Sequence, residues 1–221
     1  AVAVVDEIRR RNIMRNHSAT HLLHRALKDV LGEHVNQAGS IVLPNRLRFD
    51  FTHYEAVEEE QLREIERIVN EKILESLEVK TMNTTLERSQ EMGVVGLFED
   101  KYKDEVRVVQ MGDYSKELCG GTHVDNTSNI GLFKIISESS IASGVRRIEA
   151  ITGQEVYNYL NQLEKEIEDI SIILKTSKKD VVDRVYSVTE ELKEKEKEIN
   201  SLKSKMASSI ADDILDRKMD V

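Results

Sequence analysis

Two short stretches of the sequence each contain a pair of potential metal ligands four residues apart. His17 and His21 form the first pair, and Cys119 and His123 form the second. Four residues span about one turn of an α-helix, so both imidazoles of the first pair can project from one helix face. Two glycines within the second pair let the backbone curl, so that thiolate and imidazole can converge. One cysteine and three histidines suit a tetrahedral zinc ion, and we predict such a site.

The apolar pattern predicts which elements carry the two pairs. Residues 12–31 repeat apolar side chains at helical spacing and end at Gly32, a typical helix stop. Residues 105–111 favour a strand, and a polar, glycine-containing loop that carries residues 118–124 follows it. The predicted site therefore joins one face of the first helix to a loop far along the chain.

The rest of the first 153 residues mixes strands and helices without regular alternation. Alternating apolar and polar residues after a turn at Pro44 predict a β-hairpin over residues 38–52. The other expected elements are helices over 55–77 and 87–92 and strands over 79–86, 132–138 and 145–151. This pattern predicts an α+β domain over residues 1–153, a two-layer sandwich of mostly antiparallel sheet packed with long helices.

Residues 154–209 follow a different pattern, in which apolar residues step alternately by four and by three. Two such runs, over 156–174 and 181–206, are separated by a polar capping box. We expect a coiled coil in the form of an antiparallel helical hairpin, with self-association through this segment as the alternative. Lys195 in the second run favours a hairpin of limited length. Residues 210–221 would begin a C-terminal region.

The composition limits the classes of protein to which the sequence can belong. Its 221 residues, 39% of them hydrophobic, suffice for one core and a smaller appended module. We expect no membrane span, because no apolar run approaches roughly 18 residues, and the single cysteine fits a reducing cytoplasm. The net charge of −9 argues against a DNA partner, although a local basic patch can still bind phosphate. The sequence starts without methionine, so we expect an excised fragment.

Several stretches of the sequence resemble the signature motifs of one family. They are similar to the editing domain of alanyl-tRNA synthetases, which is shared with free-standing trans-editing proteins and, more distantly, with threonyl-tRNA synthetases. The resemblance covers residues 8–153, and the coiled coil looks like the connector that follows the editing domain in full-length alanyl enzymes. The matching stretches are residues 16–23, 37–40, 47–51, 112–113, 119–124 and 144–150.

This resemblance implies a zinc-dependent aminoacyl-tRNA deacylase that hydrolyses tRNA(Ala) mischarged with serine or glycine. The ligands of the zinc ion would be the two pairs described above. Full-length members of the family ligate alanine to tRNA(Ala) using ATP, but the ligase region and the glycine-rich segment upstream of the first helix are not in this sequence. A free-standing editor is the alternative, although such proteins usually lack so long a connector.

Residues near the ligands are candidates for further roles. Gln37 could contact substrate or water, because its amide both donates and accepts hydrogen bonds, although a glutamine exposed in a loop needs no such role. His24 continues the histidine stripe by one turn, and we expect it to support a ligand or to pack. Ser18 and Thr20 flank the ligands and could bind substrate or form local hydrogen bonds.

Arg146 and Arg147 are candidates for binding tRNA. Neighbouring side chains in a strand point to opposite faces of the sheet. One arginine could therefore contact a phosphate group while the other serves the structure.

Three other functions fit part of the pattern. A zinc protease of the helical type needs glutamate directly after the first histidine, where this sequence has Ser18. A non-catalytic module could use zinc only to staple its fold, since four protein ligands normally close a tetrahedral site. An enzyme with Cys119 as nucleophile would be active without metal. The sequence leaves open whether the zinc ion is catalytic or orients the substrate.

Overall fold

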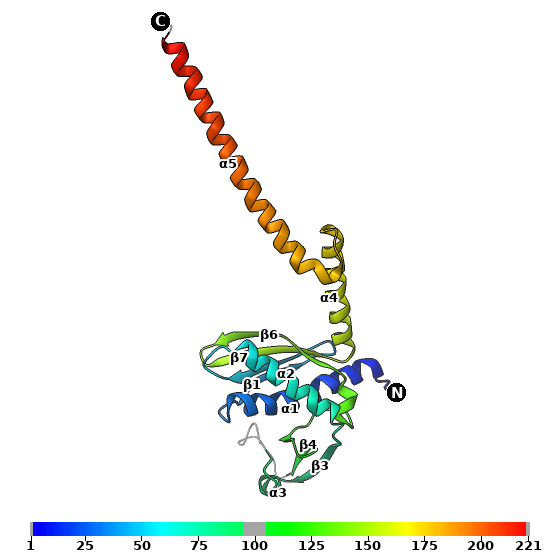
Figure 1. Cartoon of the computed structure of the whole chain (residues 1–221). Coiled ribbons are helices and arrows are strands. Elements are labelled where there is room, and N and C mark those ends of the chain that lie inside the picture. The colour runs from blue at the N-terminus through cyan, green and yellow to red at the C-terminus, as the bar shows by residue number, and fades with distance from the viewer. Residues whose placement is uncertain (1, 95–104, 220–221) are drawn as a thin grey trace. The chain divides into compact units, whose positions relative to one another are not determined.

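A computed structural model describes residues 2–94 and 105–219 of the chain (Figure 1). The chain divides into two compact units, Ala1–Tyr159 and Leu160–Val221. The first unit contains all the strands of the described residues and both predicted ligand pairs. We describe each unit by itself.

The first unit contains two antiparallel sheets. The larger sheet has the strand order β1-β2-β7-β6 and the smaller has the order β3-β4-β5. The strands of the larger sheet are β1 (Gln37–Val42), β2 (Leu47–Thr52), β6 (Phe133–Ala142) and β7 (Val145–Thr152). The strands of the smaller sheet are β3 (Val79–Thr85), β4 (Glu105–Met111) and β5 (Ser115–Leu118).

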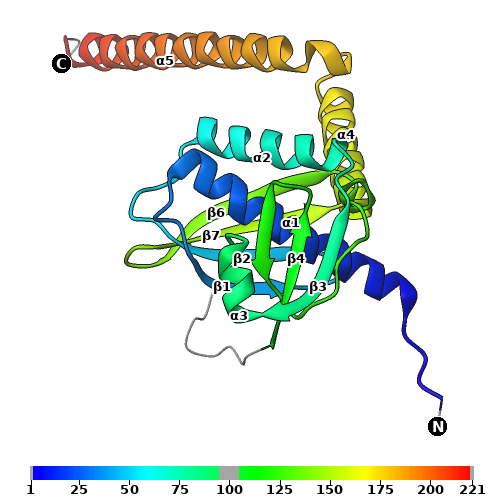
Figure 2. The same ribbon diagram turned by 90° about the horizontal axis from the view of Figure 1, so that it is seen from below.

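The long helix α1 (Glu7–Leu31) lies between the two sheets, as Figures 1 and 2 show. It contacts β1, β2 and β7 of the larger sheet and β5 of the smaller one, and α2 (Glu59–Leu74) packs beside it. Leu22, Leu23 and Leu27 on α1 are fully buried in the same core as Phe49 and Phe51 of β2. Because both sheets cover α1, polar side chains at the smaller sheet such as His21 and His24 are buried as well.

The predicted α+β fold is confirmed, with three differences in detail. Helix α1 begins at Glu7 rather than at residue 12, because Asp6 caps it by accepting a hydrogen bond from the Arg9 amide at 2.9 Å. That first part is rich in arginine and exposed, so no apolar pattern marks it. The strand β5 lies where the sequence predicted only a loop. The smaller sheet thus adds a layer to the predicted sandwich. Helix α3 (Leu86–Glu91) follows β3 as expected.

The C-terminal segment consists of α4 (Gln154–Ile173), a short 3-10 turn η3 (Lys178–Asp180) and α5 (Val181–Met219). The two helices and their short connection agree with the prediction, but α5 has 39 residues against 20 for α4, so pairing along the whole length is impossible. The apolar seams are exposed in the structure, to 37% at Leu163 and 60% at Leu192. The antiparallel hairpin stays a prediction, and it could extend at most over the length of α4.

The predicted domain boundary at residue 209 falls within a continuous helix and stays a prediction. Helix α5 continues through it to Met219, and residues 220–221 lie outside the described part of the chain. This helix and the other long helices contain many charged residues. Within residues 2–94 and 105–219, no helix combines the length and the apolar character needed to cross a lipid bilayer.

Candidate metal centre

The four predicted ligands meet at one point of the first unit. The potential ligand atoms of His17, His21, Cys119 and His123 all lie within 4.8 Å of one another. Cys119 Sγ is 3.3 Å from His123 Nε2 and 3.4 Å from His17 Nε2. Ordinary zinc–nitrogen and zinc–sulfur bonds in a tetrahedron would separate nitrogen and sulfur by about 3.5 Å. The cluster therefore has the dimensions of a mononuclear metal site.

Two elements from distant parts of the sequence bring these ligands together. Helix α1 carries both histidines of the first pair on the face toward the smaller sheet, and the turn after β5 carries Cys119. A Cβ atom at Gly121 would overlap the His17 ring, so this position requires glycine. Arg107 holds the turn by donating to the carbonyl oxygens of Cys119 and Gly121, at 2.8 and 2.6 Å. Arg107 thus holds the turn by hydrogen bonds, and Gly121 of the turn packs closely against the His17 ring.

Glu117 is buried next to the cluster and orients two histidines. Its carboxylate oxygens lie 2.5 Å from His21 Nδ1 and 2.8 Å from His24 Nδ1, so each ring donates N–H to the carboxylate. In the neutral imidazole the other nitrogen is then left with a lone pair. Among the described residues, His21 Nε2 is buried and has no hydrogen-bond partner. A metal ion in the cluster would occupy this lone pair, and the residues therefore fit such an ion.

The charges in the cluster also favour a cation. Burial raises the pKa of Cys119, but hydrogen bonds from His123 and His17 outweigh it and lower the pKa to about 3, so the residue is a thiolate. Burial also lowers the pKa of His123 to about 4, which keeps that ring neutral. For Glu117, burial raises the pKa, but the charge of protonated His21 outweighs this effect and keeps the carboxyl ionised. Burial lowers the pKa of His21, but the Glu117 carboxylate outweighs it and raises that pKa to about 10, so a metal ion would displace the proton on His21 Nε2. Thiolate and neutral imidazole are the forms that bind metals.

Ser18 and Thr20 make local hydrogen bonds. The buried Ser18 Oγ lies 3.2 Å from His123 Nδ1 and accepts the Val124 N–H at 3.1 Å, so it holds the His123 ring. Thr20 donates its hydroxyl proton to the Asn16 carbonyl at 2.8 Å. Contact of either residue with substrate remains a prediction.

A cavity of about 300 Å³ opens beside the cluster. His17, His21 and Cys119 form part of its wall, and Gln37 at the start of β1 also lines it. His24 reaches the same cavity, and its Nε2 atom is a second buried nitrogen without a partner among the described residues. It lies outside the four-residue cluster, as expected. Thus the structure brings the predicted ligands, Gln37 and His24 to one place.

Arg146 and Arg147 on β7 are placed elsewhere. The Arg146 guanidinium binds both carboxylate oxygens of Glu138, at 2.5 and 2.7 Å, and that of Arg147 binds both oxygens of Asp50, at 2.6 and 2.7 Å. Neither arginine lines the cavity beside the cluster. Their in-chain partners give both residues a structural role, and tRNA binding by them remains a prediction.

Sequence reasoning missed Glu117 and Arg107. Glu117 lies two residues before Cys119, and in a strand this spacing puts both side chains on one face. The signal is hidden in the sequence because the four residues of β5 are too few to show a strand pattern. For Arg107 we find no sequence signal, since its partners are backbone carbonyls brought close only by the fold.

Comparison with known proteins relates the chain to tRNA synthetases. Residues 106–149, which include Cys119 and His123, match the family described as "Threonyl and Alanyl tRNA synthetase second additional domain". A relative named alanine–tRNA ligase from Alkaliphilus oremlandii is 53% identical over 97% of this chain and 24% of its own length. Another of that name from Clostridioides difficile is 52% identical over 99% of this chain and 25% of its own length. The chain thus spans about a quarter of the length of the curated relatives it matches.

Proposed function

Because this chain is homologous over nearly its whole length to one region of alanine–tRNA ligases, we propose that it edits mischarged tRNA. The proposed reaction is hydrolysis of the ester that joins serine or glycine to tRNA(Ala). One zinc ion would be held by His17, His21, Cys119 and His123. Since the relatives match the helical unit as well as the first unit, they favour a synthetase over a free-standing editor.

One observation carries this proposal: the metal cluster forms part of the wall of a cavity. Its volume of about 300 Å³ has room for a small amino-acid ester, and three of the four ligand residues line it together with Gln37. A metal that only stapled the fold would need no such opening. The arrangement therefore supports a site that receives a substrate.

The surrounding residues would hold the reacting groups in place. A bound zinc ion supplies a Lewis acid for the ester carbonyl and lowers the pKa of a bound water. Glu117 fixes the His21 ring so that its free Nε2 faces the cluster, and Ser18 does the same for His123. Gln37 can donate a hydrogen bond to the substrate carbonyl or accept one from a serine hydroxyl.

Polar groups in the cavity explain how serine would be separated from alanine. A site that hydrogen-bonds the serine hydroxyl leaves its own buried donors and acceptors unpaired when alanine binds, at a cost of about 1 to 3 kcal/mol per group. Among the groups that line this cavity, Gln37 and the unpartnered Nε2 of His24 can hydrogen-bond a substrate, as can the hydroxyls of Ser40 and Thr20. Glycine would be admitted because it is small.

The competing function is a non-catalytic module in which zinc only stabilises the fold. It is favoured by the ligand count, since four protein ligands close a tetrahedral zinc site and catalytic sites usually keep one position open. Of the three histidine ligands, His17 is the one that is only partly buried. It is therefore the ligand that substrate could most easily replace in the coordination of the metal.

A deacylation assay separates the two functions. We expect the zinc-loaded chain to release serine and glycine from tRNA(Ala) faster than alanine, and Gln37→Ala to slow serine release at full zinc content. Gln162→Ala is the matched control, because this glutamine is exposed on α4 and donates a hydrogen bond to the neighbouring Glu166. The same assay on a chain extended upstream tests whether added N-terminal residues raise the rate. If neither length releases serine faster than alanine while folded and zinc-loaded, the structural module is the better account.

A further inference from the structure

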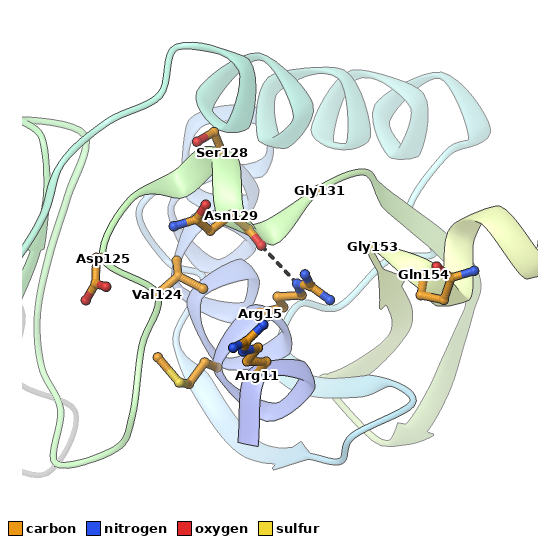
Figure 3. Close-up of a pocket in the computed structure, with 10 residues that line it drawn as sticks. Arg11, Arg15, Val124, Asp125, Ser128, Asn129, Gly131, Gly153 and Gln154 are labelled. Atoms are coloured by element: carbon orange, nitrogen blue, oxygen red, sulfur yellow. Dashed lines mark hydrogen bonds between the residues drawn. The ribbon is translucent and has the colours of Figure 1, made fainter. Parts of the chain in front are cut away.

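A second and larger cavity lies on the first unit, outside the metal centre (Figure 3). Its volume is about 560 Å³, and it is formed by α1, the turn around η2 (Thr127–Ile130) and the start of α4 at Gln154. None of the four metal ligands lines it. The metal centre does not explain this cavity.

Two arginines one helical turn apart give the cavity a positive wall. Arg15 donates from Nε to the Asn129 carbonyl at 2.9 Å and from one terminal nitrogen to the Asn12 side chain at 3.2 Å. These neutral partners fix the guanidinium without cancelling its charge. Arg11 has one acidic contact, to Glu7 at 3.4 Å, and both of those side chains are mostly exposed. Such exposed pairs contribute little, so Arg11 can exchange this contact for another anion at small cost.

The rest of the lining also suits an anion. Gly131 and Gly153 line the cavity with backbone atoms alone, and they have positive φ angles of 78° and 55°. Asp125 is the one acidic residue among those that line the cavity in the described part of the chain, and in Figure 3 it lies on the far side of Val124 from the two guanidinium groups. Paired guanidinium groups recognise phosphate through several charge-assisted hydrogen bonds.

The cavity and the metal centre draw residues from the same two chain segments. Val124 lines the cavity and directly follows His123, and Arg15 lies two residues before His17 on α1, a spacing that places the two side chains on different faces of the helix. We infer that this cavity binds a backbone phosphate of the tRNA near its aminoacylated end, through Arg11 and Arg15. This inference rests on the proposed function, because it requires that the ester at the end of a tRNA enters the neighbouring site. It adds the residues that hold the nucleic acid, which an overall charge of −9 does not reveal.

Charge reversal at Arg11 tests the inference against a closely matched control. Arg63 on α2 is likewise a mostly exposed arginine paired with a glutamate four residues earlier, so Arg63→Glu changes the same charge in the same local setting. We measure binding of uncharged tRNA(Ala) over a series of salt concentrations. Arg11→Glu should weaken affinity about tenfold, the scale of a lost charge-assisted hydrogen bond. It should also reduce the slope of log affinity against log salt by about one.

The outcomes separate this inference from the proposed function. Affinity changes for Arg63→Glu should stay within about twofold, and zinc content and thermal unfolding should be equal in both variants. If the two variants weaken binding equally, or if the unaltered chain does not bind tRNA, the phosphate site is overturned. If the unaltered chain binds tRNA and Arg11→Glu alone weakens it, but no serine is released, the phosphate site stands and the deacylase proposal fails. Arg15→Lys, which keeps the charge but loses the fork geometry, should give an intermediate loss of affinity.

Discussion

The two units of this chain use the same apolar residue types at the same helical spacing, but they bury them differently. In α1 of the first unit, Leu27 is fully buried, because sheets cover the helix on two sides. In α5 of the second unit, Leu192 is 60% exposed. An apolar periodicity thus predicts a helix in both places, while the partner that covers it is decided by tertiary structure.

This difference bears directly on the metal centre. The cluster sits on the helix that is covered from both sides, where His21, His123 and Glu117 are all nearly inaccessible to solvent. Buried polar side chains must find partners, so each ring takes a fixed orientation. A helix such as α5, whose side chains are mostly exposed, could carry the same residue types without this fixed geometry.

The largest effect that we predict follows from removing a ligand from the covered unit. Cys119→Ser or His123→Ala should reduce bound zinc from about one ion per chain to a small fraction and abolish deacylation, because each substitution removes one of four ligands. Atomic absorption on protein purified without chelator measures the metal, and His34→Ala, an exposed histidine outside the cluster, is the control. Full zinc occupancy in the double variant would disprove the site assignment.

Sequence reasoning recovered the ligands because their spacing follows local geometry. The four-residue interval on α1 and the glycines beside Cys119 are visible without any knowledge of the partner segment. The same holds for the β1–β2 hairpin, whose alternation is strict between Leu47 and Phe51. These features depend on periods of two and of 3.6 residues, which the sequence displays directly.

What stayed hidden depends on contacts between distant segments. Glu117 was missed because β5 has only four residues, and among the described strands it pairs with β4 alone. Arg146 and Arg147 form ion pairs with Glu138 and Asp50, which lie on neighbouring strands. The sequence of β7 alone therefore does not predict these ion pairs. The partner of the exposed α5 seam also depends on a segment distant in the sequence, and the hairpin with α4 stays a prediction.

A smaller effect is expected from Glu117, which supports the ligands without being one of them. Glu117→Gln keeps the size of the side chain but removes the charge that holds two Nδ1–H groups, so zinc affinity should fall about 10- to 100-fold. Competition with a chelator of known affinity measures this change. The control is Glu149→Gln on β7, a partly buried glutamate outside the cluster. Unchanged affinity in Glu117→Gln would mean that the burial of α1 alone orients the histidines.

The smallest effect is predicted for the exposed seam, and it tests the comparison between the two units most directly. Leu27→Ala in α1 should lower the free energy of unfolding of the first unit by about 2 to 5 kcal/mol, because it leaves a cavity in a closed core. Leu192→Ala should change the unfolding of α5, followed by far-UV circular dichroism, by no more than about 0.5 kcal/mol, since an exposed leucine loses little on truncation. A loss at Leu192 as large as that at Leu27 would show that the seam is covered in solution. In that case, cysteines at Leu163 and Leu192 would identify the partner: cross-links within one chain would restore the hairpin over the length of α4. Cross-links between chains, with stability that rises with protein concentration, would instead indicate self-association.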